Sequence, residues 1–215
     1  MPSTIINRKK LQSALQSVNN FSSPKIQLEQ YPTSPHVATD ILFNMQMMHG
    51  SLQGMSVADL GCGPGILSIG ARLLGASYVV AVDIDPDAIS DLVQNLESFD
   101  MKDEAIDAIL CDAIRFGAEE DRKLFDTVVL NPPFGTNLSN AGIDIEFLKR
   151  ALSIAQCHVY SLHKTTTRDF VLRTIRNLNA QAEVVAELRF DIPRMYKRHR
   201  QETVDIAVDL VHAWY

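Results

Sequence analysis

The strongest constraint on the fold is a change in hydrophobic periodicity at residue 56, where short apolar runs begin to alternate with longer amphipathic runs. The short runs predict strands at 56–60, 78–83, 105–111, 127–130 and 158–162, and the intervening runs predict helices at about 65–74, 86–99, 144–156 and 165–178. Such alternation is typical of βαβ units in a mostly parallel sheet. Two more predicted strands, 181–190 and 202–211, are separated only by a loop and should pair antiparallel. We therefore expect an α/β fold with a seven-stranded sheet and helices on both faces.

The first 50 residues are predicted to form a helical extension. Leu11, Leu15 and Val18 recur at helical spacing and predict a helix over 7–20. Ser34 is a suitable N-cap for a second helix, with Pro35 at its first position. We expect 1–50 to contribute to a ligand and substrate site of the α/β domain, 51–215, with both parts in one compact domain.

Composition indicates an ordinary soluble globular chain, because 46% of its 215 residues are hydrophobic and 21% are charged. No apolar run reaches the roughly 18 residues that a membrane span needs, and no secretory signal is recognisable. Cys62, Cys111 and Cys157 form no C-x-x-C pair, so no metal site is expected. Each cysteine is interpreted as a small buried hydrophobe.

Charge is unevenly distributed. The formal net charge is −6, yet residues 189–200 carry five Arg or Lys side chains and one Asp. A locally basic edge on an acidic body is compatible with an RNA substrate and equally with a solvated loop.

An apolar strand ending in Asp59 leads into the glycine-rich turn Gly61-Cys62-Gly63-Pro64-Gly65, which opens the next predicted helix. Glycines let the backbone turn tightly and approach a ligand closely. A dinucleotide site would have G-x-G-x-x-G to seat a pyrophosphate, but here the third glycine comes one residue early. Because the Asp59 carboxylate would repel a pyrophosphate, the motif indicates a cationic ligand group, such as the ammonium of an amino acid.

Acidic residues also follow the next two strands. Asp83, about 20 residues beyond the glycines, is placed to accept hydrogen bonds from ribose hydroxyls, with Ile84 beside it. Asp85 is expected to cap the following helix instead. Asp112 would accept a hydrogen bond from an adenine amine next to Ala113, although an Asp at a strand end is also common in turns.

The sharpest motif is Asn131-Pro132-Pro133-Phe134, directly after the fourth predicted strand. An exocyclic amine on a base is a poor nucleophile because its lone pair is conjugated into the ring. The Asn131 amide oxygen and the Pro132 carbonyl can each accept one of its N–H bonds, which directs the lone pair outward. The prolines fix the loop, and Phe134 can stack on a flat substrate. A structural Asn-Pro turn is the alternative. Four such motifs at successive strand ends indicate one ligand site, since ligands of open α/β sheets bind there.

Together these motifs resemble class I methyltransferases that act on amine nitrogens. The segments LEQYPT (28–33), NPPFGT (131–136), YSLHK (160–164) and AELR (186–189) narrow the match to the methyltransferase-like protein 5 family, and the resemblance covers nearly the whole chain. It implies a Rossmann-like fold with S-adenosylmethionine as methyl donor. It also implies N6-methylation of one adenosine in small-subunit (18S) ribosomal RNA.

The resemblance further implies residue roles and partners. Asn131 to Phe134 would hold the adenine, and the cofactor would contact Gln30, Thr33, Asp59, Gly61, Cys62, Gly63, Asp83, Ile84, Asp112, Ala113 and Asn131. The family works as a heterodimer with a small zinc-binding activator protein, which adds a strand to the edge of the sheet. It also implies a location in the nucleus, nucleolus and cytoplasm.

No separate RNA-binding module is apparent, so contacts with RNA are expected from the rim of the catalytic domain. The expected contacts are Arg8, Lys9, Lys10, His163, Lys164, Arg194, Tyr196, Lys197, Arg198 and Arg200.

Three alternative functions remain open. A protein glutamine N5-methyltransferase uses the same kind of loop, because an amide nitrogen poses the same electronic problem, but those enzymes more often have Tyr where this chain has Phe134. A guanine N2 RNA methyltransferase is the second alternative. A cofactor-binding scaffold in ribosome assembly is the third, which the intact Asn131 disfavours.

Overall fold

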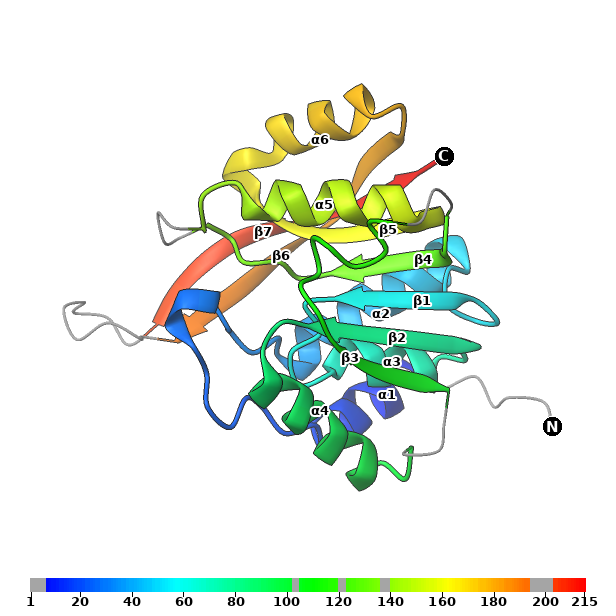
Figure 1. Ribbon diagram of the computed structural model, residues 1–215, viewed down its shortest axis with the longest axis vertical. Helices are drawn as coiled ribbons and strands as arrows, with labels where there is room; N and C mark the ends of the chain where they lie inside the picture. The colour runs from blue at the N-terminus through cyan, green and yellow to red at the C-terminus, as the bar shows by residue number, and fades with distance from the viewer. Residues whose placement is uncertain (1–6, 102–104, 120–122, 136–139, 194–202) are drawn as a thin grey trace.

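A computed structural model describes residues 7–101, 105–119, 123–135, 140–193 and 203–215. It contains a seven-stranded sheet in the order β3-β2-β1-β4-β5-β7-β6 (Figure 1). The strands are β1 (Ser56–Leu60), β2 (Tyr78–Asp83), β3 (Ile106–Leu110), β4 (Phe125–Leu130), β5 (Ala155–Lys164), β6 (Gln181–Pro193) and β7 (Thr203–Trp214).

The sheet topology confirms the α/β expectation. Neighbouring strands from β3 to β5 pair in parallel, and β7 runs antiparallel to both β5 and β6. Both β5 and β7 are longer than predicted, because Lys164 of β5 still pairs with Val208 and Trp214 of β7 still pairs with His158. Cys157 lies on the added part of β5 and is exposed, so the prediction that all three cysteines are buried is wrong.

Helices cover both faces of the sheet, as expected. The first face carries α1 (Arg8–Leu15), α2 (Pro35–His49), α3 (Ile66–Leu73) and α4 (Pro86–Ser98), and the second carries α5 (Ile143–Ile154) and α6 (Arg168–Asn177). Short 3-10 helices occur at Ile26–Leu28 and Thr165–Thr167.

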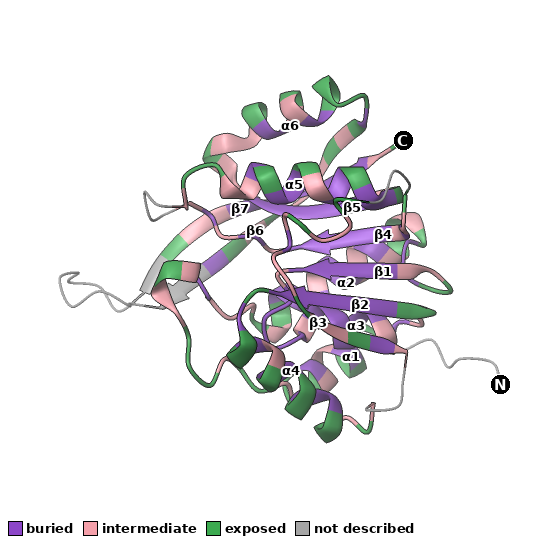
Figure 2. Cartoon of the chain, viewed as in Figure 1, coloured by how far each residue is buried: buried purple, intermediate pink, exposed green. Residues whose placement is uncertain are grey.

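Each face of the sheet has its own hydrophobic core. Because side chains alternate across a strand, Val57 and Val79 join the cluster under α1–α4, whereas Ala58 and Val80 join the cluster under α5 and α6. The central strands are consequently buried along most of their length (Figure 2). In the described part of the chain, no helix combines the length and apolarity needed to cross a membrane.

Local capping signals set the helix starts. The Ser34 hydroxyl accepts a hydrogen bond from the Val37 amide (3.2 Å), and Pro35 begins α2. Asp85 caps α4 by accepting from the Asp87 amide (3.0 Å). Both predicted caps are therefore confirmed.

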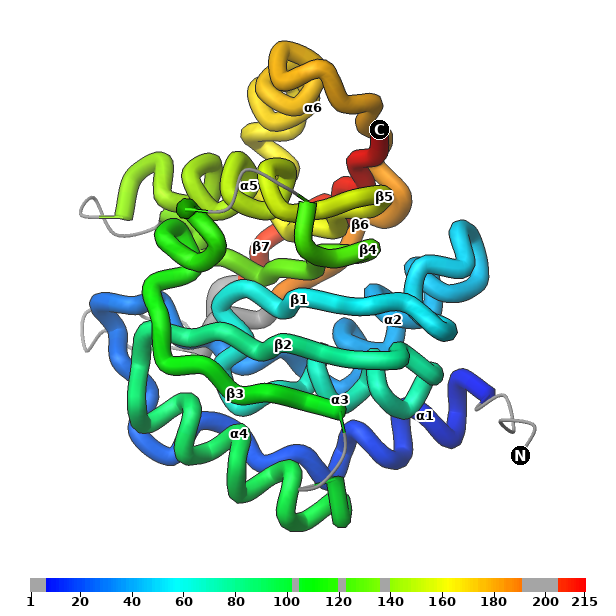
Figure 3. Tube along the Cα trace, turned by 45° about the vertical axis from the view of Figure 1, so that its right-hand side comes forward, coloured from blue at the N-terminus to red at the C-terminus, as the bar shows by residue number. Residues whose placement is uncertain are grey.

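The segment between α1 and α2 crosses the carboxyl ends of the parallel strands. The first helix ends at Leu15 rather than near residue 20, because side chains of α4 bind the backbone beyond it. The Asn19 amide donates to Asn95 Oδ1 and the Ser22 amide donates to Asp91 Oδ2, each at 2.9 Å. The chain then runs along α4 before it returns as α2 (Figure 3).

A buried carboxylate fastens α6 to the C-terminal strand. Asp209 of β7 is fully buried and accepts hydrogen bonds from the Arg168 guanidinium at 2.6 and 2.8 Å and from the Thr165 hydroxyl at 2.8 Å. Burial favours the protonated acid, but the hydrogen bonds from Arg168 and Thr165 outweigh it and hold the pKa of Asp209 below its ordinary value.

We expect Asp209→Asn to lower the free energy of unfolding by about 2 kcal/mol at pH 7, because it removes charge-assisted hydrogen bonds. The contribution of the carboxylate is fully present above its unfolded pKa of about 3.9 and is lost as pH falls through the lower folded value. Urea denaturation of both proteins should therefore give a difference that disappears in acid. Asp205→Asn, on the same strand but exposed, is the control and should change stability by less than about 0.5 kcal/mol. Equal effects of the two substitutions would contradict this role for Asp209.

Candidate functional site

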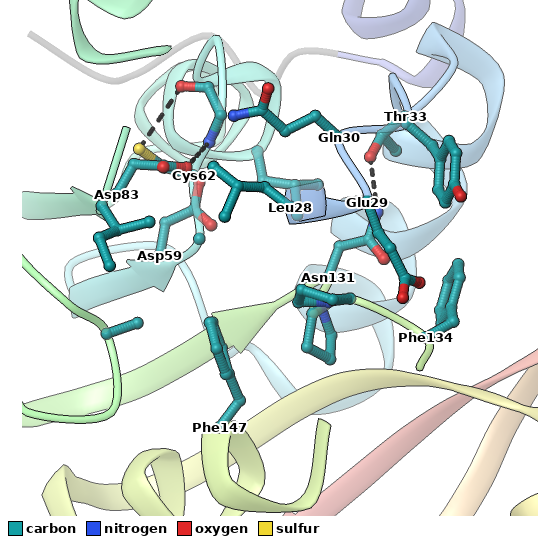
Figure 4. Close-up of a pocket in the computed structure, with 18 of the residues that line it drawn as sticks. Leu28, Glu29, Gln30, Thr33, Asp59, Cys62, Asp83, Asn131, Phe134 and Phe147 are labelled. Carbon is teal, nitrogen blue, oxygen red and sulfur yellow. Dashed lines mark hydrogen bonds between the residues drawn. The ribbon is translucent and has the colours of Figure 1, made fainter. Parts of the chain in front are cut away.

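A cavity opens at the carboxyl ends of β1, β2 and β4, where the sequence motifs meet (Figure 4). Every residue predicted to contact the cofactor lines it, as do Pro132, Pro133 and Phe134. The cavity is also lined by residues that the sequence motifs did not predict: Phe21, Leu28, Glu29, Tyr31, Pro64, Ile66, Leu67, Ile114, Ile143, Phe147 and Phe190. Most of these are single apolar residues without a motif, so only the fold brings them to the cavity.

The glycine turn is fixed to the end of β2. The amides of Gly61 and Cys62 donate to the Val82 carbonyl at 2.8 and 3.0 Å, and the Gly63 amide donates to Asp83 Oδ2 at 2.9 Å. Gly63 has φ +52°, and a Cβ atom there would lie 2.7 Å from the Phe21 ring. Only glycine fits this position without displacing the ring that forms the cavity wall.

Asp59 lines the cavity with a buried carboxyl group. The residue is 1% exposed, and its Oδ2 accepts a 2.6 Å hydrogen bond from the Ser68 hydroxyl. Among the described residues, Oδ1 has no hydrogen-bond partner. Burial raises the pKa of Asp59 to about 7. A cationic group would both pair with Oδ1 and favour the ionised carboxylate, which fits the ammonium of an amino acid.

Asp83 faces the same cavity from the end of β2. Its two carboxylate oxygens accept from the amides of Gly63 and Asp85, each at 2.9 Å, and burial raises its pKa. Each oxygen retains a lone pair for a ligand hydroxyl. Across the cavity, Asp112 Oδ1 accepts from the Ile114 amide at 3.0 Å, beside the buried Ala113. The adjacent Ile84 is exposed.

Asn131 is held in one orientation by the N-terminal segment. Its Nδ2 donates a 2.9 Å hydrogen bond to the Thr33 hydroxyl, as Figure 4 shows. The amide oxygen Oδ1 is buried and has no partner within the described structure. Thr33 therefore leaves the carbonyl side of the amide available to an N–H donor in the cavity.

Phe134 is more deeply buried than expected for a side chain that stacks on a substrate. It is 4% exposed and meets Phe190 edge to face, with ring centroids 5.6 Å apart. Its contact with a flat substrate stays a prediction.

Gln30 connects the N-terminal segment to the end of β2. Its Nε2 donates to Asp85 Oδ2 and its Oε1 accepts from the Lys25 amide, both at 2.7 Å. Burial would raise the pKa of Asp85, but hydrogen bonds from Lys25 and Gln30 outweigh it and hold the pKa below its usual range. Gln30 thus has a positioning role in addition to lining the cavity.

Several predicted RNA contacts do not lie on the exposed rim of the cavity. The prediction is wrong for His163, which is fully buried between Asp144 Oδ2 (3.1 Å) and Ser161 Oγ (3.0 Å). Lys164 is half-buried at the end of β5. The first turn of α1, with Arg8, Lys9 and Lys10, lies where the parallel strands begin, on the side away from the cavity (Figures 1 and 3).

The remaining predicted RNA contacts lie outside the described residues: Arg194, Tyr196, Lys197, Arg198 and Arg200.

The raised pKa of Asp59 predicts pH-dependent binding of an amino acid ammonium, here tested with S-adenosylmethionine. Affinity should rise with pH up to about 7 as Asp59 ionises and should fall above about 8, where an α-amino group loses its proton. Calorimetric titration at several pH values measures this profile. Asp59→Asn should weaken binding and remove the rise in affinity between acidic pH and pH 7. If that rise is unchanged in the variant, Asp59 does not pair with the ammonium.

Known proteins resemble this chain in both sequence and structure. The chain matches the family model of ribosomal protein L11 methyltransferase (PrmA) over residues 32–131. It is 48% identical to the rRNA N(6)-adenosine-methyltransferase METTL5 of Danio rerio, over 94% of this chain and 96% of that protein. The Drosophila melanogaster protein of the same name is 44% identical over 94% and 93% of the two chains.

A solved structure shows the same fold. Protein PH1948 from Pyrococcus horikoshii has 31% identity and a TM-score of 0.80, over 96% of this chain and 97% of that one. High identity over nearly the full length of the relatives places this chain in the METTL5 family of rRNA N(6)-adenosine-methyltransferases.

Proposed function

We propose that this chain transfers a methyl group from S-adenosylmethionine to N6 of an adenosine in ribosomal RNA. The main support is the pair of buried atoms Asn131 Oδ1 and Asp59 Oδ1, which lie at the same cavity and have no hydrogen-bond partner in the described part of the chain. Thr33 fixes the orientation of the Asn131 amide. Asn131 Oδ1 can accept a hydrogen bond from the amine to be methylated, and Asp59 Oδ1 can pair with the ammonium of the methyl donor. Relatives named rRNA N(6)-adenosine-methyltransferase support the substrate class.

The cavity residues fit S-adenosylmethionine by their donor and acceptor chemistry. Asp59 would pair with the ammonium, Asp83 would accept from ribose hydroxyls, and Asp112 would accept from the adenine amine. When bound, the cofactor supplies a methyl group already activated by its sulfonium. The protein therefore needs no strong general base and has to orient the acceptor amine.

Asn131 would perform that orientation. Its Oδ1 and the Pro132 carbonyl each accept one N–H of the adenine amine, which directs the nitrogen lone pair toward the methyl group. The proton released after transfer passes to solvent. Adenine within a duplex cannot reach such a cavity, so the target must be single-stranded or flipped out.

Variants of Asn131 and Thr33 distinguish an effect on methyl transfer from an effect on cofactor binding. Asn131→Ala should lower kcat by about 100-fold to 1000-fold, because it removes a preorganised acceptor, while the cofactor Kd stays nearly unchanged. Thr33→Val removes the acceptor for Asn131 Nδ2 and should lower kcat about tenfold or more. Labelled methyl transfer to ribosomal RNA measures both.

Thr33→Ser is the matched control, because it retains the hydroxyl and should preserve most of the activity. Equal losses of kcat and cofactor affinity in Asn131→Ala would contradict the role assigned to Asn131.

A protein glutamine substrate is the principal competing function, since the L11 methyltransferase model matches part of the chain. That match ends at residue 131 and leaves most of the loop, α5 and the C-terminal strands outside. The METTL5 relatives match nearly the whole chain, so the RNA substrate is favoured.

We also propose a heterodimer with a small zinc-binding activator that adds a strand along β3. This short edge strand borders a surface depression lined by residues of β3 and α4, and Leu110 at its end is 57% exposed. Exposed charged side chains disfavour strand addition. The described part of the opposite edge strand, β6, carries Glu183, Glu187 and Arg189, whereas β3 carries only Asp107.

Leu110→Lys should weaken the heterodimer about tenfold or more, because it places a charge at the proposed contact. Leu178→Lys, at the exposed end of α6, is the control and should leave affinity unchanged. Copurification and calorimetric titration of the two chains provide the measurement. Equal weakening by both variants would exclude a specific β3 contact.

The specific target and location follow from the same proposal. We infer one adenosine of small-subunit (18S) ribosomal RNA as the target. Such a substrate is available in the nucleolus during assembly and in the cytoplasm afterwards, so we expect the chain in both compartments. Cell fractionation with detection of the chain tests this location.

A further inference from the structure

Three histidines and one glutamate gather at the end of the sheet where the parallel strands begin. His49 is the last residue of α2, His158 lies on β5, His212 lies on β7, and Glu183 lies on β6. The rings of His49 and His212 are 4.0 Å apart between centroids, and those of His158 and His212 are 5.2 Å apart. None of these residues lines the methyl-transfer cavity.

The two histidines nearest Glu183 point one nitrogen each toward the same carboxylate oxygen. His49 Nε2 and His212 Nδ1 both lie 3.5 Å from Glu183 Oε1. In a tetrahedral zinc site, with bonds of about 2.0–2.1 Å, ligand atoms are about 3.4 Å apart. All three atoms lie within 4.8 Å of one another, so modest side-chain rotation brings them around one ion.

The opposite nitrogens are held by neighbours, in the arrangement typical of metal-binding histidines. His49 Nδ1 is 2.8 Å from the Tyr160 hydroxyl, which is itself 2.7 Å from Ser51 Oγ. His212 Nε2 is 3.0 Å from His158 Nδ1. If His49 Nδ1–H donates to Tyr160 and His212 Nε2–H donates to His158, the two nitrogens that face Glu183 both carry free lone pairs.

We propose that His49, Glu183 and His212 bind one divalent transition-metal ion of the zinc class. The cysteine spacing gave no sign of this site, because its ligands come from three separate elements. Two imidazoles and a carboxylate suit zinc, and a water molecule would complete four ligands. Access is open, since the Glu183 side chain is 50% exposed and that of His49 is 21% exposed.

The bound ion would join α2 to the C-terminal hairpin β6–β7. Thr33, which orients Asn131, lies just before the N-terminus of α2. The ion would fix the C-terminus of the same helix. We therefore expect a stabilising role for the ion, without participation in methyl transfer.

Calorimetric titration of the full chain with zinc chloride tests the proposal directly. We expect one ion per chain and a melting temperature that rises by about 5–10 °C when zinc exceeds its Kd a hundredfold. His49→Gln and Glu183→Gln, both at least partly exposed, should fold normally and lose this binding. His158→Gln should weaken binding about 10-fold to 100-fold, because His158 only orients His212.

Matched controls are His36→Gln on the same helix and Glu146→Gln on α5, whose side chains are 64% and 51% exposed. Neither should alter zinc affinity or the rise in melting temperature. Cobalt substitution identifies the ligands, and a spectrum with nitrogen and oxygen ligands but no thiolate charge-transfer band is expected. A thiolate band, absence of binding, or full binding by Glu183→Gln would overturn the proposal.

Discussion

The site depends on two buried acceptor atoms that have no hydrogen-bond partner among the residues that the structure describes. Asp59 Oδ1 and Asn131 Oδ1 lie at the ends of the adjacent parallel strands β1 and β4, whose residues Leu60 and Leu130 pair in register. An unsatisfied buried acceptor costs about 1–3 kcal/mol, so the strands, the glycine turn and the proline loop must oppose its collapse. A ligand that donates hydrogen bonds to these two oxygens removes this cost. Part of the binding free energy therefore comes from the fold, which keeps both acceptors in place before the ligand binds.

The N-terminal segment completes this arrangement. It crosses the strand ends, binds α4 through Asn95 and Asp91, and binds the end of β2 through Gln30 and Asp85. These contacts position Thr33, which fixes the orientation of the Asn131 amide. The acceptor that faces the substrate is thus controlled by a segment about 100 residues earlier in the chain. Residues 1–50 are therefore proposed to serve the site as well as the hydrophobic core.

Features with local causes could be predicted from the sequence. The bounds of β1 and β2 match the apolar runs, and Ser34 and Asp85 cap the expected helices. The cavity was predictable because its polar residues follow strand ends. Burial that depends on distant partners was not predictable: His163 is enclosed by Asp144 of α5, and the cluster of His49, Glu183 and His212 assembles across three elements.

The cavity is proposed to direct methyl transfer to an adenine amine. The most direct measurement is transfer of labelled methyl from S-adenosylmethionine to total RNA and protein, with and without the activator, followed by nucleoside and amino acid analysis. We expect the label to appear as N6-methyladenosine in small-subunit ribosomal RNA. Label in N2-methylguanosine or in a protein glutamine, with none in N6-methyladenosine, would contradict it.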